Sequence, residues 1–139
     1  MKLTIMSKIA LDTNVLIYLL DANEQSEKRR IANELVAAGP YISSQVISEY
    51  LNVCHNRFKM SKQNSVDSLM TWLSYCELSS FEIPVYTNTL RLIRDYQFQM
   101  FDAIVVSTAL ISGCSVLYSE DMHHNLNVDG QLKIINPFI

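Results

Sequence analysis

The sequence predicts an α/β domain in which helices cover both faces of a central parallel sheet of about five strands. Two observations predict this class. Short apolar runs, typical of strands buried on both faces, alternate along the chain with helical segments of roughly 10–15 residues. The chain has 139 residues, of which 49% are apolar and 18% charged, which suits one hydrophobic core. We therefore expect a single domain over residues 1–139.

Five segments are expected to be strands, because each is short, apolar and bounded by turn or cap residues. They are residues 8–12 (KIALD), 41–44 (YISS), 81–85 (FEIPV), 115–120 (SVLYSE) and 133–138 (KIINPF). The segment at 81–85 is the weakest prediction, since Pro84 lacks the N–H group that a sheet hydrogen bond requires.

The helices are predicted from their start and stop signals and from apolar periodicity. They are residues 15–20, 26–39, 45–58, 61–76, 88–98 and 101–114. Ser26, Ser44, Ser61 and Thr87 are the expected caps, and Gly39 and Gly113 mark two helix ends.

Composition excludes several classes of protein. No apolar run reaches the roughly 18–20 residues of a membrane span, and residues 1–12 lack the sustained apolar segment of a signal peptide. Cys54, Cys76 and Cys114 are odd in number and widely spaced, so we expect free thiols rather than a disulfide or a zinc site. These features predict a soluble cytoplasmic domain. The net charge of −3 is weak evidence against nucleic-acid binding, because several of the acids are candidates for one metal pocket.

Two acids directly follow predicted strands. Asp12 comes after residues 8–11 and Asp121 after residues 115–118, and the carboxyl ends of parallel strands share the sheet edge where ligands bind. Asp12 is also a good helix cap, although Asn14 could cap that helix equally well and leave Asp12 free. Asp121 also suits a turn. Alternation along an extended segment places Ser119 and Asp121 on the same side and Glu120 on the other.

Two further acids lie on predicted helices. Asp102 in a first helical turn is favoured by the helix dipole, but its apolar flanks imply burial, and a buried carboxylate needs a cation or a proton. Glu49 borders the apolar arc of its helix, where an amphipathic role is the simplest interpretation. Four carboxylates converging at about 4 Å would repel by roughly 4 kcal/mol per pair at an effective dielectric near 20. Their convergence would require a divalent cation, and oxygen ligands favour Mg²⁺ or Mn²⁺ over zinc.

These residues lie in blocks that resemble the PIN-domain nucleases, in particular the VapC-type toxins of bacterial toxin–antitoxin pairs. The blocks are LDTNVLIYL, SSQVISEYLNV, FDAIVVSTALISGC, VLYSEDM and INPF, and they span nearly the whole chain. The resemblance implies a PIN-like three-layer α/β/α sandwich with an acidic pocket that binds Mg²⁺ or Mn²⁺. It places the catalytic and metal-binding acids at Asp12, Glu49, Asp102 and Asp121. Asn14 matches the polar residue that orients the first acid, and Ser119 matches the hydroxyl of an S/T-x-D block.

The resemblance also implies what the domain does. We expect a metal-dependent endoribonuclease, a hydrolase that uses metal-activated water on RNA phosphodiesters, acting as the toxin of a toxin–antitoxin pair. A homodimer and a cognate antitoxin whose tail occupies the catalytic groove are implied as well. Phe101 and Asn125 depart from residues common in the family, Trp and Gly, and neither change affects the chemistry. Arg57 and Lys59 belong to a basic cluster that could contact RNA, whose identity and cleavage sequence the residues leave open.

Other functions remain open. One is a catalytically silent PIN-like module that binds RNA or protein, and another is a stand-alone RNA-processing nuclease without an antitoxin. A phosphatase of the haloacid-dehalogenase type needs a second Asp where Asn14 stands, and a toprim-like site needs a D-x-D pair. His123 and His124 are adjacent in a turn, which does not place two imidazoles on one helical face, so we expect surface or rim residues.

Overall fold

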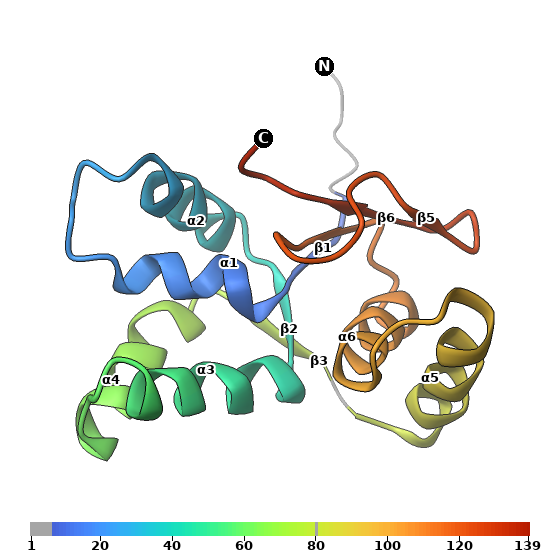
Figure 1. The fold of residues 1–139 in the computed structure, drawn as a ribbon, viewed down its shortest axis with the longest axis horizontal. Helices are drawn as coiled ribbons and strands as arrows, with labels where there is room; N and C mark the ends of the chain where they lie inside the picture. The colour runs from blue at the N-terminus through green and yellow to red at the C-terminus, as the bar shows by residue number, and fades with distance from the viewer. Residues whose placement is uncertain (1–6, 80) are drawn as a thin grey trace.

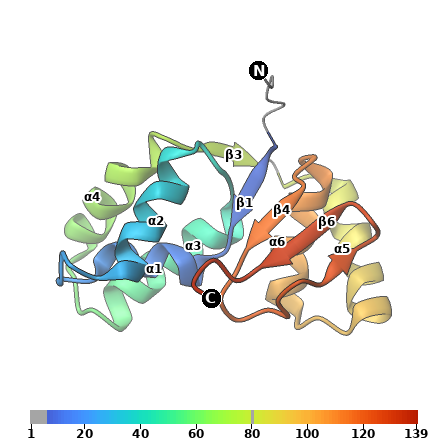
Figure 2. The same cartoon turned by 90° about the horizontal axis from the view of Figure 1, so that it is seen from above.

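The computed structural model describes residues 7–79 and 81–139, which form a mostly parallel sheet flanked by helices (Figures 1 and 2). The strand order is β3-β2-β1-β4-β6-β5, and every neighbouring pair is parallel except β5 and β6. The strands are β1 (Ile9–Leu11), β2 (Tyr41–Ser43), β3 (Glu77–Ser79), β4 (Val116–Tyr118), β5 (Asn127–Val128) and β6 (Leu132–Ile135). The expected α/β class with a parallel sheet is confirmed, and the described residues contain six strands in place of about five.

The helices are α1 (Thr13–Ile17), the 3₁₀ turn η1 (Tyr18–Leu20), α2 (Glu27–Ala37), α3 (Ser44–Asn56), α4 (Lys62–Leu73), α5 (Ile83–Tyr96) and α6 (Met100–Ile111). Ser26 and Ser61 cap α2 and α4 as expected, each accepting a backbone N–H three residues on. The cap of α3 is Ser43 rather than Ser44, which is the first helical residue. Gly39 and Gly113 follow α2 and α6 at φ +73° and +81°, conformations that glycine adopts without strain.

The prediction of a strand at residues 81–85 is wrong. The chain enters α5 at Ile83 with Pro84 in the first turn, where the missing N–H costs nothing because no helical partner exists for it. Thr87 therefore lies inside the helix and does not cap it. The third strand is β3, an exposed segment that directly precedes the region predicted.

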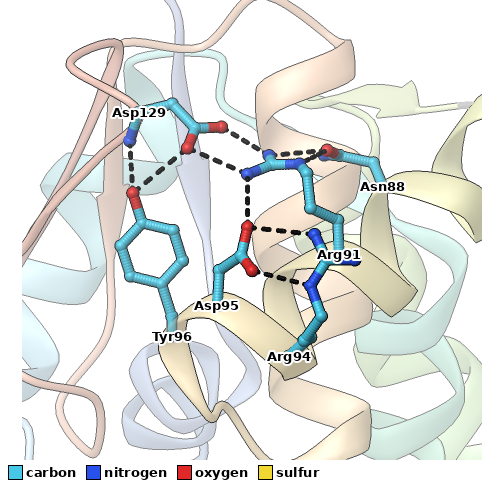
Figure 3. A network of polar contacts seen from close by, with 6 residues as sticks. All are labelled: Asn88, Arg91, Arg94, Asp95, Tyr96 and Asp129. Carbon is cyan, nitrogen blue, oxygen red and sulfur yellow. Dashed lines mark hydrogen bonds and ion pairs between the residues drawn. The ribbon is translucent and has the colours of Figure 1, made fainter.

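The sixth strand, β5, forms an antiparallel hairpin with β6. The turn contains Asp129 and Gly130, both at positive φ (+56° and +67°), a sequence pair typical of tight hairpins. Arg91 on α5 forms an ion pair with Asp129, and Tyr96 accepts the Asp129 N–H at 2.9 Å (Figure 3). These contacts fix the hairpin against α5.

The core lies between the sheet and its helices. Leu11, Ile42, Leu117 and Ile134 from four neighbouring strands are fully buried, and α6 buries most of its length, as its apolar sequence predicts. All three cysteines are free thiols, as expected. No helix within the described residues is long and apolar enough to cross a membrane.

Candidate functional site

An open cavity of about 540 Å³ lies where the carboxyl ends of β1 and β4 meet. These strands pair in parallel, and the Asp12 N–H donates to the Tyr118 carbonyl at 2.9 Å, so the segments that follow them emerge side by side. Strands β2 and β3 lie on one side of β1, and β4 lies on its other side. The strand order therefore reverses between β1 and β4, which makes this edge the topological switch point. The cavity is lined by all four acids singled out above: Asp12, Glu49, Asp102 and Asp121.

Asp12 is the most deeply placed of these acids, with 5% of its surface exposed. Its Oδ1 accepts the Thr13 N–H at 2.8 Å, so it caps α1, while Oδ2 accepts the Ser119 hydroxyl at 2.8 Å. Capping and facing the cavity are therefore compatible. Burial raises the pKa of Asp12 from 3.8 to about 6 against the lowering effect of these hydrogen bonds, and the charges of Asp102 and Glu49 add to the rise.

Asn14 links the ends of the two central strands. Its side-chain amide donates to Asp12 Oδ2 at 3.2 Å and to Asp121 Oδ2 at 3.1 Å. Its carbonyl oxygen accepts the Glu120 N–H at 2.9 Å. Ser119, fully buried, contacts the same carboxylate of Asp12 and accepts the Met122 N–H at 3.3 Å. Asn14 can thus orient both Asp12 and Asp121, and Ser119 can orient Asp12.

Helices α3 and α6 bring the remaining acids to the cavity. Glu49 is half-buried on α3, and its Oε1 accepts the Thr13 hydroxyl at 2.7 Å. Asp102 is half-buried in the first turn of α6, and burial, followed by the charges of Glu49 and Asp121, raises its pKa. Sequence reasoning missed Thr13, although it stands between Asp12 and Asn14 in the DTN block. Asp121 is the exposed member of the set.

These four acids lack ion-pair partners in the described part of the chain. Among residues 7–79 and 81–139, no Lys or Arg forms an ion pair with any of them. Carboxylate oxygens are the ligands that hard divalent cations prefer, so the donor set fits such an ion. No three His, Cys, Asp or Glu side chains in those ranges already stand close enough to form a metal site. Binding would therefore draw the carboxylates closer together.

The cavity has a fifth carboxylate that alternation did not predict. Glu120 and Tyr18 both line the cavity wall. The Glu120 carboxylate forms an ion pair with Lys28. Of the two basic residues expected near the substrate, Arg57 lines the cavity and Lys59 is absent from its wall.

The two histidines also lie outside the cavity wall. His123 is exposed, and His124 Nδ1 accepts the Asn136 N–H at 2.9 Å. Asn125 beside them adopts φ +71°, the left-handed turn that asparagine tolerates.

Comparison with known proteins gives the same architecture. The sequence profile of the PIN domain matches residues 9–126. A toxin–antitoxin complex from Klebsiella pneumoniae contains a chain with 21% identity, TM-score 0.68 and coverage of 95% of this chain and 98% of that one. VapBC2 from Rickettsia felis, solved with a DNA fragment from its promoter, has 18% identity, TM-score 0.69 and coverages of 92% and 98%.

A third similar structure is VapC20 from Mycobacterium tuberculosis, described as a toxin that cleaves the sarcin–ricin loop. It has 18% identity, TM-score 0.64 and coverages of 82% of this chain and 90% of that one. No curated protein sequence matches the chain. At these identities the structural likeness is one of fold.

Proposed function

The chain belongs to the PIN domain family, and on that premise we propose that it is a divalent-metal-dependent endoribonuclease. One observation carries this proposal. Four carboxylates without cationic partners in the described residues, Asp12, Glu49, Asp102 and Asp121, line one cavity at the carboxyl edge of the sheet. Placing four acids around one cavity adds charge repulsion and no stability, so their arrangement is best explained by a ligand of opposite charge.

The cation would be Mg²⁺ or Mn²⁺, held by Asp12, Asp102 and Asp121, with Glu49 in contact directly or through water. The raised pKa values of Asp12 and Asp102 support this assignment, because they reflect burial and repulsion that a cation would relieve. When bound, such an ion favours deprotonation of water and screens the charge of a phosphodiester.

Residues in and beneath the cavity wall would orient these acids. Asn14 and Ser119 hold Asp12 and Asp121 at a shared edge, and the Thr13 hydroxyl fixes one oxygen of Glu49. Preorganised ligands bind a cation more tightly than mobile ones, because less rotamer freedom is lost. Arg57 in the cavity wall would contact an RNA phosphate, and Lys59 would contribute from farther out.

Asp12→Asn tests the proposal, with Asp67→Asn as the matched control. Asp67 is exposed on α4, and Gln63 on the same helix is its hydrogen-bond partner. Wild type and the control should cleave RNA with Mg²⁺ or Mn²⁺ and stop when the metal is chelated. Loss of a ligand should lower the rate of Asp12→Asn by about 100-fold or more. Equal cleavage by Asp12→Asn would refute the proposed site, and RNA binding without cleavage by wild type would favour a silent binding module.

We further propose that the nuclease is the toxin of a toxin–antitoxin pair, acting in the cytoplasm as a homodimer. The support is its likeness in fold to chains solved within toxin–antitoxin complexes. Coexpression with the protein of an adjacent small gene should yield a stable complex in which RNA cleavage is suppressed. Light scattering on the purified chain should give twice the monomer mass. If the proteins of the adjacent genes leave RNA cleavage undiminished, that result would favour a stand-alone RNA-processing nuclease.

A further inference from the structure

Glu120 is held on both sides by groups distant in sequence. The Tyr18 hydroxyl donates to its Oε1 at 2.7 Å, and the Lys28 ammonium donates to its Oε2 at 2.8 Å. Lys28 also donates to the Tyr18 oxygen at 3.1 Å, which closes a three-membered polar cluster. The backbone N–H of Glu120 donates to Asn14 on the opposite side. Residue 120 is therefore anchored through both its main chain and its side chain.

Two aromatic rings lie beside the lysine of this cluster. The Lys28 ammonium lies 4.9 Å from the centre of the Tyr18 ring and 5.4 Å from that of Phe138. Those two rings meet edge to face, with centres 4.9 Å apart. A lysine placed against aromatic faces gains cation–π attraction, which favours the position from which Lys28 reaches Glu120 while 46% of the lysine side chain stays exposed. Phe138 thus helps to hold Lys28 beside Glu120 at the wall of the acidic cavity.

Glu120 differs from the other acids of the cavity in its contacts. Its carboxylate forms an ion pair with Lys28 and accepts the Tyr18 hydroxyl. The other four acids form no ion pair within the described residues. Because its carboxylate is already paired, Glu120 is better suited to positioning its neighbours than to binding the metal ion.

The residue that it positions is its neighbour Asp121. Asp121 is exposed, and its side chain is held by the Asn14 amide at 3.1 Å. Because few contacts hold the side chain of Asp121, its direction depends on the backbone conformation at residue 121. The anchored residue before it, Glu120, restricts that conformation. We propose that Glu120, clamped by Lys28 and Tyr18, is a positioning residue that keeps Asp121 facing the cavity and so raises the affinity for the catalytic divalent cation. The inference rests on the proposed metal-dependent nuclease function.

Lys28→Met tests the clamp, and Lys62→Met, at an exposed lysine on α4, is the matched control. The first readout is amide hydrogen exchange in metal-free protein. Exchange at Glu120 and Met122 should be about fivefold faster in Lys28→Met, the effect expected of losing one well-placed ion pair. Exchange in the β1 and β4 ladder should not change. Lys62→Met should match wild type throughout.

The second readout is RNA cleavage as a function of Mg²⁺ concentration. The Mg²⁺ midpoint should rise about fivefold in Lys28→Met, while kcat at saturating Mg²⁺ and KM for RNA stay near wild type. Glu120→Gln should behave similarly, and the double variant should be no worse than either single one, because the same clamp is lost.

The outcomes separate this inference from the function on which it rests. Unchanged exchange and an unchanged Mg²⁺ midpoint in Lys28→Met would overturn the clamp. A raised KM for RNA at an unchanged midpoint would also overturn it, since Lys28 would then be a phosphate contact. A wild-type protein that neither cleaves RNA nor responds to Mg²⁺ would refute the nuclease function. The exchange comparison would still decide whether Lys28 anchors residue 120.

Discussion

Replacing Asp12 by Asn should stabilise the metal-free protein at neutral pH. Burial of this side chain raises its pKa from 3.8 to about 6, and about two pH units at 1.36 kcal/mol each correspond to roughly 3 kcal/mol. Between about pH 4 and 6 the folded state binds more protons at Asp12 than the unfolded state does, so stability falls as pH rises through this window. Asn removes this cost but loses the Oδ2 acceptor that both Ser119 and Asn14 face, worth about 1–1.5 kcal/mol. The net gain above pH 6 is roughly 1–2 kcal/mol.

The assay is thermal unfolding with a chelator at pH 7.5 and pH 4, with Asp67→Asn as control. Asp12→Asn should melt about 3–8 °C above wild type at pH 7.5. This advantage should vanish at pH 4, where Asp12 is largely protonated in the folded protein. Added Mg²⁺ should raise the melting temperature of wild type more than that of the variant. Melting of Asp12→Asn at or below wild type at pH 7.5 would refute the reasoning.

Three further predictions concern separate contacts. Thr13→Val removes the hydroxyl that holds Glu49 and should lower the initial rate of Mg²⁺-dependent cleavage by about tenfold, whereas Thr13→Ser should retain it; equal rates would contradict this role. Arg91→Met breaks the pair with Asp129 and should lower the free energy of unfolding by about 1 kcal/mol in denaturant titrations, without changing cleavage. Arg57→Met should raise KM for RNA severalfold and weaken its salt dependence at unchanged kcat; a fall in kcat alone would argue against a phosphate contact.

The fold could be predicted wherever burial leaves a local pattern. Strands β1, β2, β4 and β6 are short apolar runs because the sheet is covered on both faces, and the serine caps and glycine stops marked most helices. The exposed edge strand β3 has no such pattern, since no core selects its side chains. The apolar run FEIPV has the composition of a strand, but Pro84 suits the first turn of a helix.

The grouping of residues at the candidate site could be predicted in part for a related reason. The position of Asp12 after a buried strand is local information, and the parallel pairing of β1 with β4 then brings Asp121 nearby. The contact between Thr13 and Glu49 joins two elements through tertiary packing, which no local pattern encodes. Alternation along a strand predicts that Glu120 points away from the side shared by Ser119 and Asp121. This prediction is wrong because the chain bends after β4, and the Glu120 side chain forms an ion pair with Lys28 of α2 at the cavity wall.

The central claim is that the four carboxylates form one divalent-cation site, and Mn²⁺ tests it most directly. Crystals of the wild-type protein grown with Mn²⁺ should show an anomalous peak inside the cavity at about 2.1 Å from carboxylate oxygens of Asp12 and at least one of its three partners. The Asp12→Asn variant should lose that peak. Mn²⁺ bound elsewhere, or no ion in the cavity at a concentration that supports RNA cleavage, would contradict the account.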